Sequence, residues 1–332
     1  MLFQPLTLRC GLVVPNRIAL APMTNCQSQP DGRLGEDEFN WLARRADGGF
    51  GMIETCAAYV AQDGKAWAGE LGVDRDDAGL PRLAARIKQG GAVGIVQLFH
   101  GGLRAEPAVS GLPVVGPETV DVVRLTEQFA VAAERCERAG FDGVELHGAH
   151  GYILCQFLSR TQNPRPFEER ARVVRDVMRA VRARVSPRFC VGVRLSLEDR
   201  GNAEGLDLDE SLQVARWLAD DGADFIHASL WNAAKPTHKR PDEHPIPLVR
   251  AAVPREVAVI VAGALWMHAD AEAALARGAD MVAIGRSAIV NPDWPRTDGV
   301  VRTPVTREQL ASVCVSPVFQ GYLTRWRDFV RE

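Results

Sequence analysis

The sequence predicts an α/β protein built as a single (β/α)8 TIM barrel with a short N-terminal cap. Short runs rich in Val, Ile and Ala alternate with longer amphipathic segments along the chain, which is the pattern of parallel strands joined by helices. There are eight such runs, and the eighth closes a barrel where fewer would leave an open sheet. A length of 332 residues suits one barrel of this kind.

The predicted strands occupy the eight apolar runs. They are residues 17–23, 50–55, 93–99, 141–147, 189–195, 224–229, 257–262 and 280–285. Between them, segment 126–138 places Phe129, Ala133 and Cys136 at the three-to-four-residue spacing of a helix. We expect further helices in the segments with the same pattern, which are 168–184, 209–219 and 269–277.

Three glycines mark predicted helix ends. Gly140, Gly222 and Gly278 each close a helical segment just before a strand, where glycine takes the left-handed conformation that ends a helix. The first ten or so residues precede the first strand, and we expect them to cap the N-terminal end of the barrel. No linker or low-complexity tract interrupts the chain, so we expect residues 1–332 to form one domain.

The composition argues against several classes of protein. The chain is 46% hydrophobic and 24% charged with a net charge of −3, which is ordinary for a globular protein and argues against a nucleic-acid partner. No stretch approaches the roughly 18 apolar residues that span a membrane, and the N-terminus lacks the features of a signal peptide. The seven cysteines are scattered without a C-x-x-C pair. We therefore expect a cytoplasmic protein without a metal cluster.

The most informative motif contains His147, His150 and Tyr152, at the end of the fourth predicted strand and directly after it. Two imidazoles three residues apart can converge on one polar atom, and a phenol two residues further on can donate a proton. Such a set can polarise a carbonyl group and protonate the carbon beside it. Taken alone, the two histidines can equally cap backbone groups or bind a metal.

The barrel prediction brings this motif together with other residues, because active sites of these barrels lie at the C-terminal ends of the strands. The residues predicted at that end are Thr24, Gln97, His100, His147, His150, Arg194, Gly263, Gly285 and Arg286. Glycines after the last two strands, with Arg286 beside the second, favour a phosphate site. Backbone N–H groups approach an anion closely there, and the guanidinium adds charge.

Two side chains near this phosphate site suit an aromatic ring system. Arg194 lies in an apolar strand, where it either pairs with Glu54 or Glu145 or presents its cation to an electron-rich ring. The amide of Gln97 offers both a donor and an acceptor. An amide, an arginine and a hydroxyl around a phosphate site favour a flat heterocycle such as a flavin over a sugar phosphate.

Several segments, in a fixed order, resemble the Old Yellow Enzyme family of FMN-dependent ene-reductases (NADH:flavin oxidoreductases) over nearly the whole chain. They are residues 16–24, 97–100, 147–152, 157–159, Asn163 with Arg165, 194–196, 285–286 and 291–294. The resemblance implies FMN as the cofactor, NADH or NADPH as the reductant and a small activated alkene as the substrate. The implied reaction is ping-pong, with hydride passing from NAD(P)H to FMN and then to the β-carbon of the alkene.

The resemblance also implies roles for individual residues. Those implied to bind FMN are Pro22, Met23, Thr24, Ala57, Gln97 and Arg194 around the ring system, and Gly263, Ala264, Gly285 and Arg286 around the phosphate. His147 and His150 are implied to bind the substrate carbonyl and Tyr152 to protonate the α-carbon. We place Phe99 and Cys26 beside the substrate as well, although an inert, partly buried thiol is the main alternative for Cys26.

The sequence departs from the family pattern at several points. Segment 159–170 is shorter than usual, and segment 101–119 is brief. Phe99 stands where many relatives carry tryptophan, and Ala264 replaces a common glycine. These departures concern the shape of the pocket and its lid more than the chemistry.

Other interpretations stay open at this point. A Schiff-base lyase would use Lys235, a metal enzyme would use His147 and His150 with a carboxylate, and a non-catalytic flavin-binding protein is a third alternative. We expect His100 to orient a loop, His227 to be a satisfied barrel histidine, and Lys235, His238 and Lys239 to form a solvated basic loop. The segment with Tyr322, Arg325 and Trp326 reaches a neighbouring subunit in a homo-oligomer or packs on its own barrel.

Overall fold

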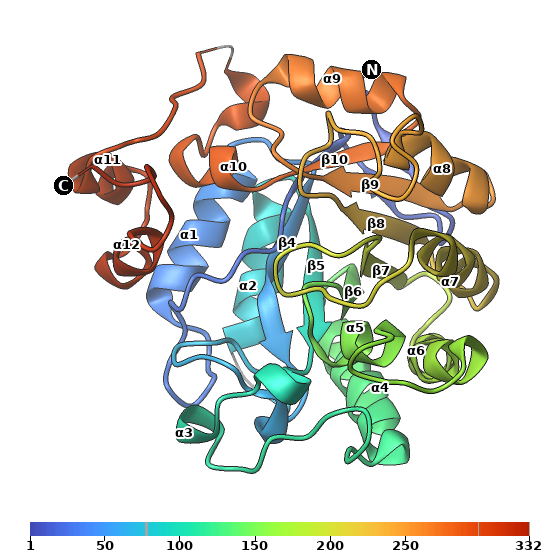
Figure 1. The fold of residues 1–332 in the computed structure, drawn as a ribbon. Helices are drawn as coiled ribbons and strands as arrows, with labels where there is room; N and C mark the ends of the chain where they lie inside the picture. The colour runs from blue at the N-terminus through green and yellow to red at the C-terminus, as the bar shows by residue number, and fades with distance from the viewer. Residues whose placement is uncertain (77–78, 298, 332) are drawn as a thin grey trace.

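A computed structural model describes residues 1–76, 79–297 and 299–331. Its centre is a closed barrel in which eight parallel strands pair in chain order and the last strand pairs with the first (Figure 1). The strands are β3 (Ile18–Leu20), β4 (Met52–Tyr59), β5 (Val93–Phe99), β6 (Gly143–Gly148), β7 (Cys190–Ser196), β8 (Phe225–Ser229), β9 (Ala258–Ala262) and β10 (Met281–Ile284). The predicted (β/α)8 class and all eight predicted strand positions are confirmed.

Strand β4 runs well past its predicted end, whereas β6 and β7 each exceed theirs by one residue. The sequence predicts a strand at residues 50–55, whereas β4 continues to Tyr59. A register shift between Glu54 and Ala57 interrupts the pairing with β5, which then resumes from Ala57 to Tyr59. Such an irregularity redirects a strand, and apolar periodicity alone does not reveal it.

The principal helices surround the barrel. They are α1 (Glu36–Asp47), α2 (Gly79–Gln89), α4 (Val122–Arg138), α6 (Phe167–Arg184), α7 (Leu208–Asp220), α8 (Pro245–Ala252) and α9 (His268–Ala276). The short helices are α3 (Pro107–Ser110), α5 (Ile153–Leu158), α10 (Arg286–Val290), α11 (Arg307–Ser312) and α12 (Pro317–Leu323). Gly140, Gly222 and Gly278 have φ angles of 88°, 110° and 111°, which confirms them as left-handed ends of α4, α7 and α9.

The N-terminal segment caps the barrel as predicted. Strand β1 (Leu6–Thr7) pairs with β2 (Val13–Val14) in a small antiparallel hairpin. Leu8 and Val14 of this segment are buried in one apolar cluster with residues that begin barrel strands, namely Met52, Val93, Cys190, Phe225, Ala258 and Met281. The hairpin therefore closes the end of the barrel at which the strands begin.

The C-terminal helices lie beside α1, on the outside of the barrel (Figure 1). Phe319 of α12 packs edge-on against Trp41 of α1, with ring centroids 5.7 Å apart. The backbone N–H of Ser316 donates to Gln27 Oε1 at 3.1 Å. The segment thus packs on its own barrel, which is one of the two predicted alternatives.

Among the described residues, no helix is long and apolar enough to cross a bilayer.

Candidate active site

A cavity of about 620 Å³ opens where the barrel strands end. Eight of the residues that the sequence places in the site line this cavity: Pro22, Met23, His150, Arg194, Gly263, Ala264, Gly285 and Arg286. They come from the ends of β3, β7, β9 and β10 and from the loop after β6. Closure of the barrel brings these distant segments together at its C-terminal end, as expected for this fold.

One side of the cavity suits a phosphate group. Gly263 has a φ of 155°, and a Cβ atom there would lie 2.5 Å from the carbonyl oxygen of Leu230, so only glycine fits. Gly285 precedes α10, which begins at Arg286. The N–H groups in the first turn of a helix have no partner within the helix and can donate to an anion. The side chain of Arg286, which is exposed, adds a positive charge.

Arg194 lies at the inner wall of the cavity with 6% of its surface exposed. Burial lowers the pKa of its guanidinium, and the charges of Glu145 and Glu54 oppose that effect. Among the described residues no close ion pair joins Arg194 to either carboxylate; His227 lies nearest to both, and their charges act on Arg194 from further away. The Nε of Arg194 is buried without a hydrogen-bond partner. A buried N–H of this kind requires an acceptor, and a ligand in the cavity can supply it.

A buried polar network lies inside the barrel near Arg194. Gln97 donates from Nε2 to Glu145 Oε1 at 2.6 Å, and Nδ1 of His227 lies 2.7 Å from Glu145 Oε2 and 3.7 Å from Glu54 Oε2. Burial opposes charge on His227 and Glu145, but their attraction raises the pKa of the imidazole and lowers that of the Glu145 carboxyl. Burial and the neighbouring Glu145 raise the pKa of Glu54 to about 7. His227 thus has carboxylate partners at Nδ1, whereas its Nε2 is buried without a hydrogen-bond partner, so the predicted satisfied histidine holds for one ring nitrogen.

The motif at the end of β6 and in the loop that follows forms a cluster of aromatic rings. The ring of His147 lies 4.9 Å from that of His150 and 4.9 Å from that of Tyr152. Phe99 lies 5.1 Å from Tyr152, and Trp67 stacks on Phe99 at 5.8 Å. Because His150 also lines the large cavity, the cluster extends from the cavity to Trp67.

Hydrogen bonds fix the orientation of both histidines. Nδ1 of His147 accepts from the backbone N–H of Ala149 at 3.3 Å, which leaves Nε2 to carry the proton of the neutral ring. Nε2 of His150 lies 2.7 Å from Oγ of Ser229. Burial, together with nearby positive charges, holds the pKa of both imidazoles well below 6.5. Both rings are therefore neutral near pH 7, and His147 can donate from Nε2. His150 can donate from Nδ1 when its Nε2 accepts from the Ser229 hydroxyl.

Tyr152 is held between the ring cluster and a cation. It is 6% exposed, and the guanidinium carbon of Arg104 lies 4.6 Å from its ring centroid. Burial raises the pKa of the phenol above its ordinary value, and the charge of Arg104 offsets only part of this effect. The phenol is therefore protonated at neutral pH. Arg104 also donates from Nη1 to the carbonyl oxygen of His150 at 2.5 Å.

Sequence reasoning missed three neighbours of this cluster: Trp67, Arg104 and Ser229. Trp67 lies in a loop and Arg104 in a short 3-10 helix (Gly102–Arg104), where no periodicity marks them. Ser229 ends β8, and its position at a strand end is the one signal that identifies it. His100, by contrast, behaves as expected, because its Nδ1 accepts from Gly102 N–H at 3.1 Å and so orients the loop after β5.

A second, very small hollow adjoins the ring cluster. Its lining includes Thr24, Cys26 and Ala57 from the predicted site, with Trp67 and Glu70. Burial, followed by the charge of Glu70, raises the pKa of the Cys26 thiol to about 11. This favours the inert thiol for Cys26, since a reactive cysteine needs its thiolate form.

The C-terminal segment reaches both hollows from its own barrel. Trp326 lines the large cavity, and Tyr322 contacts the side chain of Thr24. The two rings lie 6.0 Å apart, and the guanidinium carbon of Arg325 lies 5.5 Å from the Tyr322 ring centroid. The segment therefore forms part of the wall of the site.

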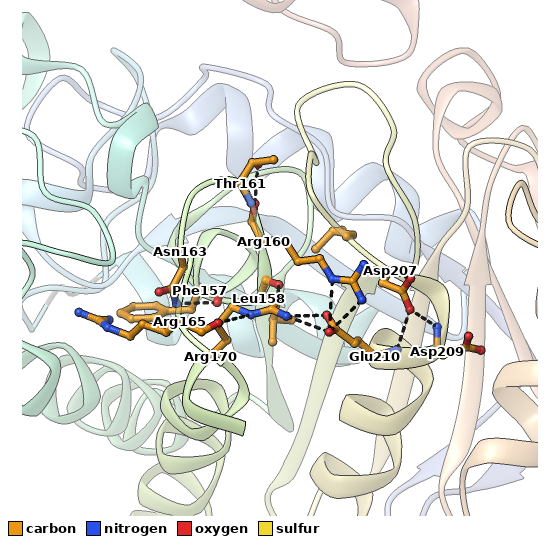
Figure 2. Close-up of polar contacts among 12 residues, drawn as sticks. Phe157, Leu158, Arg160, Thr161, Asn163, Arg165, Arg170, Asp207, Asp209 and Glu210 are labelled. Atoms are coloured by element: carbon orange, nitrogen blue, oxygen red, sulfur yellow. Dashed lines mark hydrogen bonds and ion pairs between the residues drawn. The ribbon is translucent and has the colours of Figure 1, made fainter. Parts of the chain in front are cut away.

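Polar contacts hold segment 159–170, which follows α5, in place (Figure 2). Nη2 of Arg170, whose side chain is buried, donates to Glu210 Oε1 and Oε2 at 2.9 and 2.8 Å, and Nη1 donates to the carbonyl oxygen of Leu158. Nδ2 of Asn163 donates to the carbonyl oxygen of Phe157 at 2.8 Å. Arg160 reaches the same Glu210 carboxylate at 3.0 Å. These contacts fix the segment against α5 and α7.

The structure gives little support to the two rival enzyme classes. Lys235 is exposed in the loop after β8, whereas a Schiff-base lysine is activated by burial or a neighbouring cation. In the parts of the chain that the structure describes, the groups of three metal-ligating side chains are Glu54 with Glu145 and His227, and Cys10 with Cys190 and Asp224. Neither group includes His147 or His150.

Comparisons with known proteins agree with this geometry. The model of the NADH:flavin oxidoreductase / NADH oxidase family matches residues 1–299. The chain is 34% identical to the probable NADH-dependent flavin oxidoreductase YqiG of Bacillus subtilis, covering 88% of this chain and 86% of that protein. It is 33% identical to an NADPH dehydrogenase of Bacillus cytotoxicus, covering 89% and 91%.

Solved structures show the same relationship. The Old Yellow Enzyme homologue of Zymomonas mobilis superimposes with a TM-score of 0.81 at 25% identity, covering 93% of this chain and 96% of that one. Morphinone reductase in complex with tetrahydroNAD gives a TM-score of 0.79 at 25% identity, with 93% of each chain covered.

Fold and site together define a barrel enzyme that uses a flavin for oxidation and reduction. The chain belongs to the NADH:flavin oxidoreductase / NADH oxidase family, among the Old Yellow Enzyme homologues. Its cofactor is FMN and its reductant is NADH or NADPH. The unpartnered Nε of Arg194, the cavity and the glycine at 263 fit such a group.

Proposed function

We propose that residues 1–332 form one FMN-binding domain that acts as an ene-reductase on small activated alkenes. The observation that carries this proposal is the position of His147, His150 and Tyr152, whose rings lie side by side and adjoin the cavity through His150. When bound, FMN supplies the hydride chemistry, accepting hydride from NAD(P)H and delivering it to the β-carbon of an α,β-unsaturated carbonyl compound.

In this proposal the protein residues around the cavity hold the cofactor. Arg194 and Gln97 bind the polar edge of the ring system, and Pro22, Met23, Thr24 and Ala57 line it. The phosphate is bound at the opposite side by Gly263, Ala264, Gly285 and Arg286. The positive charge of Arg194 favours negative charge on the bound group, and it acts strongly because the side chain is buried.

The two histidines are proposed to bind the substrate. Each neutral imidazole donates one hydrogen bond to the carbonyl oxygen, where negative charge develops as the β-carbon gains a hydride. A donor of this kind contributes about 2–4 kcal/mol in a site from which water is excluded. Phe99 and Trp67 form an apolar wall beside the pair, so the alkene carbons lie in an apolar environment.

Tyr152 is proposed to supply the proton. Its phenol is protonated at neutral pH because burial raises its pKa, and its ring adjoins that of His147. It donates its proton to the α-carbon, and the resulting charge on the phenol oxygen is stabilised by Arg104. The proton is later replaced from solvent.

The experiment is a spectrum followed by an assay. The purified protein should be yellow and release FMN, and no FAD, on denaturation. Under anaerobic conditions, 2-cyclohexenone should accelerate the oxidation of NADH or NADPH and be converted to cyclohexanone. A colourless protein that does not take up FMN contradicts the cofactor assignment. A flavoprotein whose NAD(P)H oxidation is unaffected by enones, maleimides and nitroalkenes contradicts the ene-reductase proposal.

A further inference from the structure

Two cysteines far apart in the sequence meet at the end of the barrel opposite the cavity. Cys10 lies in the connection between β1 and β2, and Cys190 is the first residue of β7. Their sulfur atoms and a carboxylate oxygen of Asp224 all lie within 4.8 Å of one another. Both thiols are free. The flavin site, at the other end of the strands, does not use them.

The two thiols differ in accessibility. Cys10 is partly exposed, whereas Cys190 is fully buried. The neighbouring Cys190 thiol lowers the pKa of Cys10, and backbone N–H groups add to this effect against burial and the charge of Asp224. Burial raises the pKa of Cys190 well above its ordinary value. An oxidant in solution therefore meets Cys10 first, and in its more reactive form.

We propose that Cys10 and Cys190 form a peroxide-oxidisable dithiol that closes into a disulfide and fastens the N-terminal hairpin to β7. Cys10 is the residue that peroxide attacks, and Cys190 is the residue that resolves the product. The disulfide is a modification at the end of the barrel that the N-terminal hairpin covers, and it takes no part in the reduction of alkenes.

The chemistry is balanced with hydrogen peroxide as the oxidant. The Cys10 thiolate attacks one peroxide oxygen, so that an S–O bond forms, the O–O bond breaks and hydroxide leaves to become water. Cys190 then attacks the sulfenic sulfur, so that the S–S bond forms, the S–O bond breaks and a second water leaves with the Cys190 proton. The thiols together lose two electrons, and the peroxide is reduced to two molecules of water.

The surroundings of Cys10 and Cys190 allow the disulfide to form. The sulfurs must approach to about 2.05 Å, and in this proposal the short hairpin connection is the part that moves. Beyond Cys10, at Gly11, a Cβ atom would meet nothing within 4 Å, so the connection has room to shift. The buried partner is fixed by β-strand pairing with β6.

A metal ion is the competing occupant of the same three residues. The carboxylate of Asp224 already accepts from the backbone N–H of Val191 at 2.8 Å, and Arg182 lies 3.3 Å from the same oxygen. A bound dication would have to displace or oppose that guanidinium. The geometry thus favours thiol oxidation over metal binding.

The test uses the intact holoenzyme treated with an equimolar amount of hydrogen peroxide. Free thiols are then alkylated, and the protein is digested without reductant for mass spectrometry. A cross-linked peptide pair containing Cys10 and Cys190 should appear, and dithiothreitol should remove it. In Cys190→Ser, Cys10 should instead react with dimedone, which traps sulfenic acids. The control Cys314→Ser removes an exposed thiol elsewhere and should leave the cross-link unchanged.

Stability provides a second readout. Oxidation should raise the Tm of the wild-type enzyme, because the link restricts the unfolded chain, and should leave that of Cys10→Ser unchanged. Alkene reduction should be the same before and after oxidation. The proposal is overturned if Cys10 is oxidised without loss of the Cys190 thiol, or if neither residue reacts. It is also overturned if Zn²⁺ binds stoichiometrically in the wild type but not in Cys10→Ser and blocks oxidation.

Discussion

The Oε1 atom of Glu145 lies 2.6 Å from the Nε2 atom of Gln97, and the two residues are register partners on β6 and β5. A carboxylate only accepts hydrogen bonds, so the amide nitrogen of Gln97 must face Glu145. The carbonyl oxygen of the amide is then available to a donor on a ligand. Glu145 thus sets which end of Gln97 a bound group meets, although Glu145 itself is fully buried.

This relationship predicts a large effect of Glu145→Gln. The substitution removes the carboxylate closest to His227, whose charge raises the pKa of that imidazole, and breaking a buried ion pair costs about 3–5 kcal/mol. The free energy of unfolding, measured by urea denaturation, should fall by that amount, and FMN should be retained less tightly. Glu127→Gln, which removes an exposed partner of Arg184, should leave the midpoint unchanged. An equal midpoint for both variants would show that the buried pair contributes nothing.

Replacing either histidine should affect substrate binding and not the cofactor. In His147→Ala or His150→Ala, one donor to the carbonyl oxygen is lost, so phenolic inhibitors should bind more weakly and alkene reduction should slow by about 10²-fold or more. FMN content, read from the visible spectrum, should stay at the wild-type level. Loss of the flavin in either variant would assign that histidine to the cofactor instead.

Tyr152→Phe should separate the two half-reactions. The change removes the hydroxyl and keeps the ring against Phe99 and His147. Stopped-flow reduction of the flavin by NAD(P)H needs no proton from the phenol and should change little. Reoxidation by cyclohexenone should slow by about 10²-fold or more, which is the usual size of general-acid catalysis. Two unchanged half-reactions would remove Tyr152 from the mechanism.

Arg286→Ala should weaken FMN binding. Its guanidinium adds a charge-assisted contact to the phosphate, and because the side chain is exposed we expect a loss of about tenfold in affinity. Fluorescence of released FMN on dilution gives the dissociation constant. Arg188→Ala removes an exposed arginine before β7, at the far end of the barrel, and should bind FMN normally. Similar losses in both variants would point to general charge effects.

Two of the buried histidines, His147 and His150, predict a pH dependence of stability. Their pKa values in the folded protein lie well below 6.5 because of burial, so below pH 6.5 the unfolded chain binds protons that the folded protein does not. The contribution of these two imidazoles to the free energy of unfolding is therefore fully present above pH 6.5 and is lost as the pH falls below it. The loss is up to about 1.4 kcal/mol per pH unit for each imidazole. The double variant His147→Asn/His150→Asn should show a shallower slope between pH 6.5 and 5, and an unchanged slope would contradict the assignment.

The sequence was sufficient for the architecture because apolar periodicity is a local property. Each run of Val, Ile and Ala predicts a strand, and each barrel strand exposes its C-terminal end to the same face. Because Arg194, Gly263 and Gly285 all stand at the ends of predicted strands, the sequence predicts that they lie near one another. The position of β4 beyond residue 55 was missed, because the register shift between Glu54 and Ala57 depends on pairing with β5.

The fold class and the order of the strands follow from local sequence patterns, and so does the grouping of His147, His150 and Tyr152 in one short motif. The charge and orientation of these groups depend on tertiary contacts. Arg104 and Trp67 come from connections between strands, whose position depends on barrel closure, and they complete the surroundings of Tyr152. Burial, which sets the pKa of a side chain, arises from contacts between segments far apart in the chain. Local sequence cannot specify such contacts, and the closed barrel does.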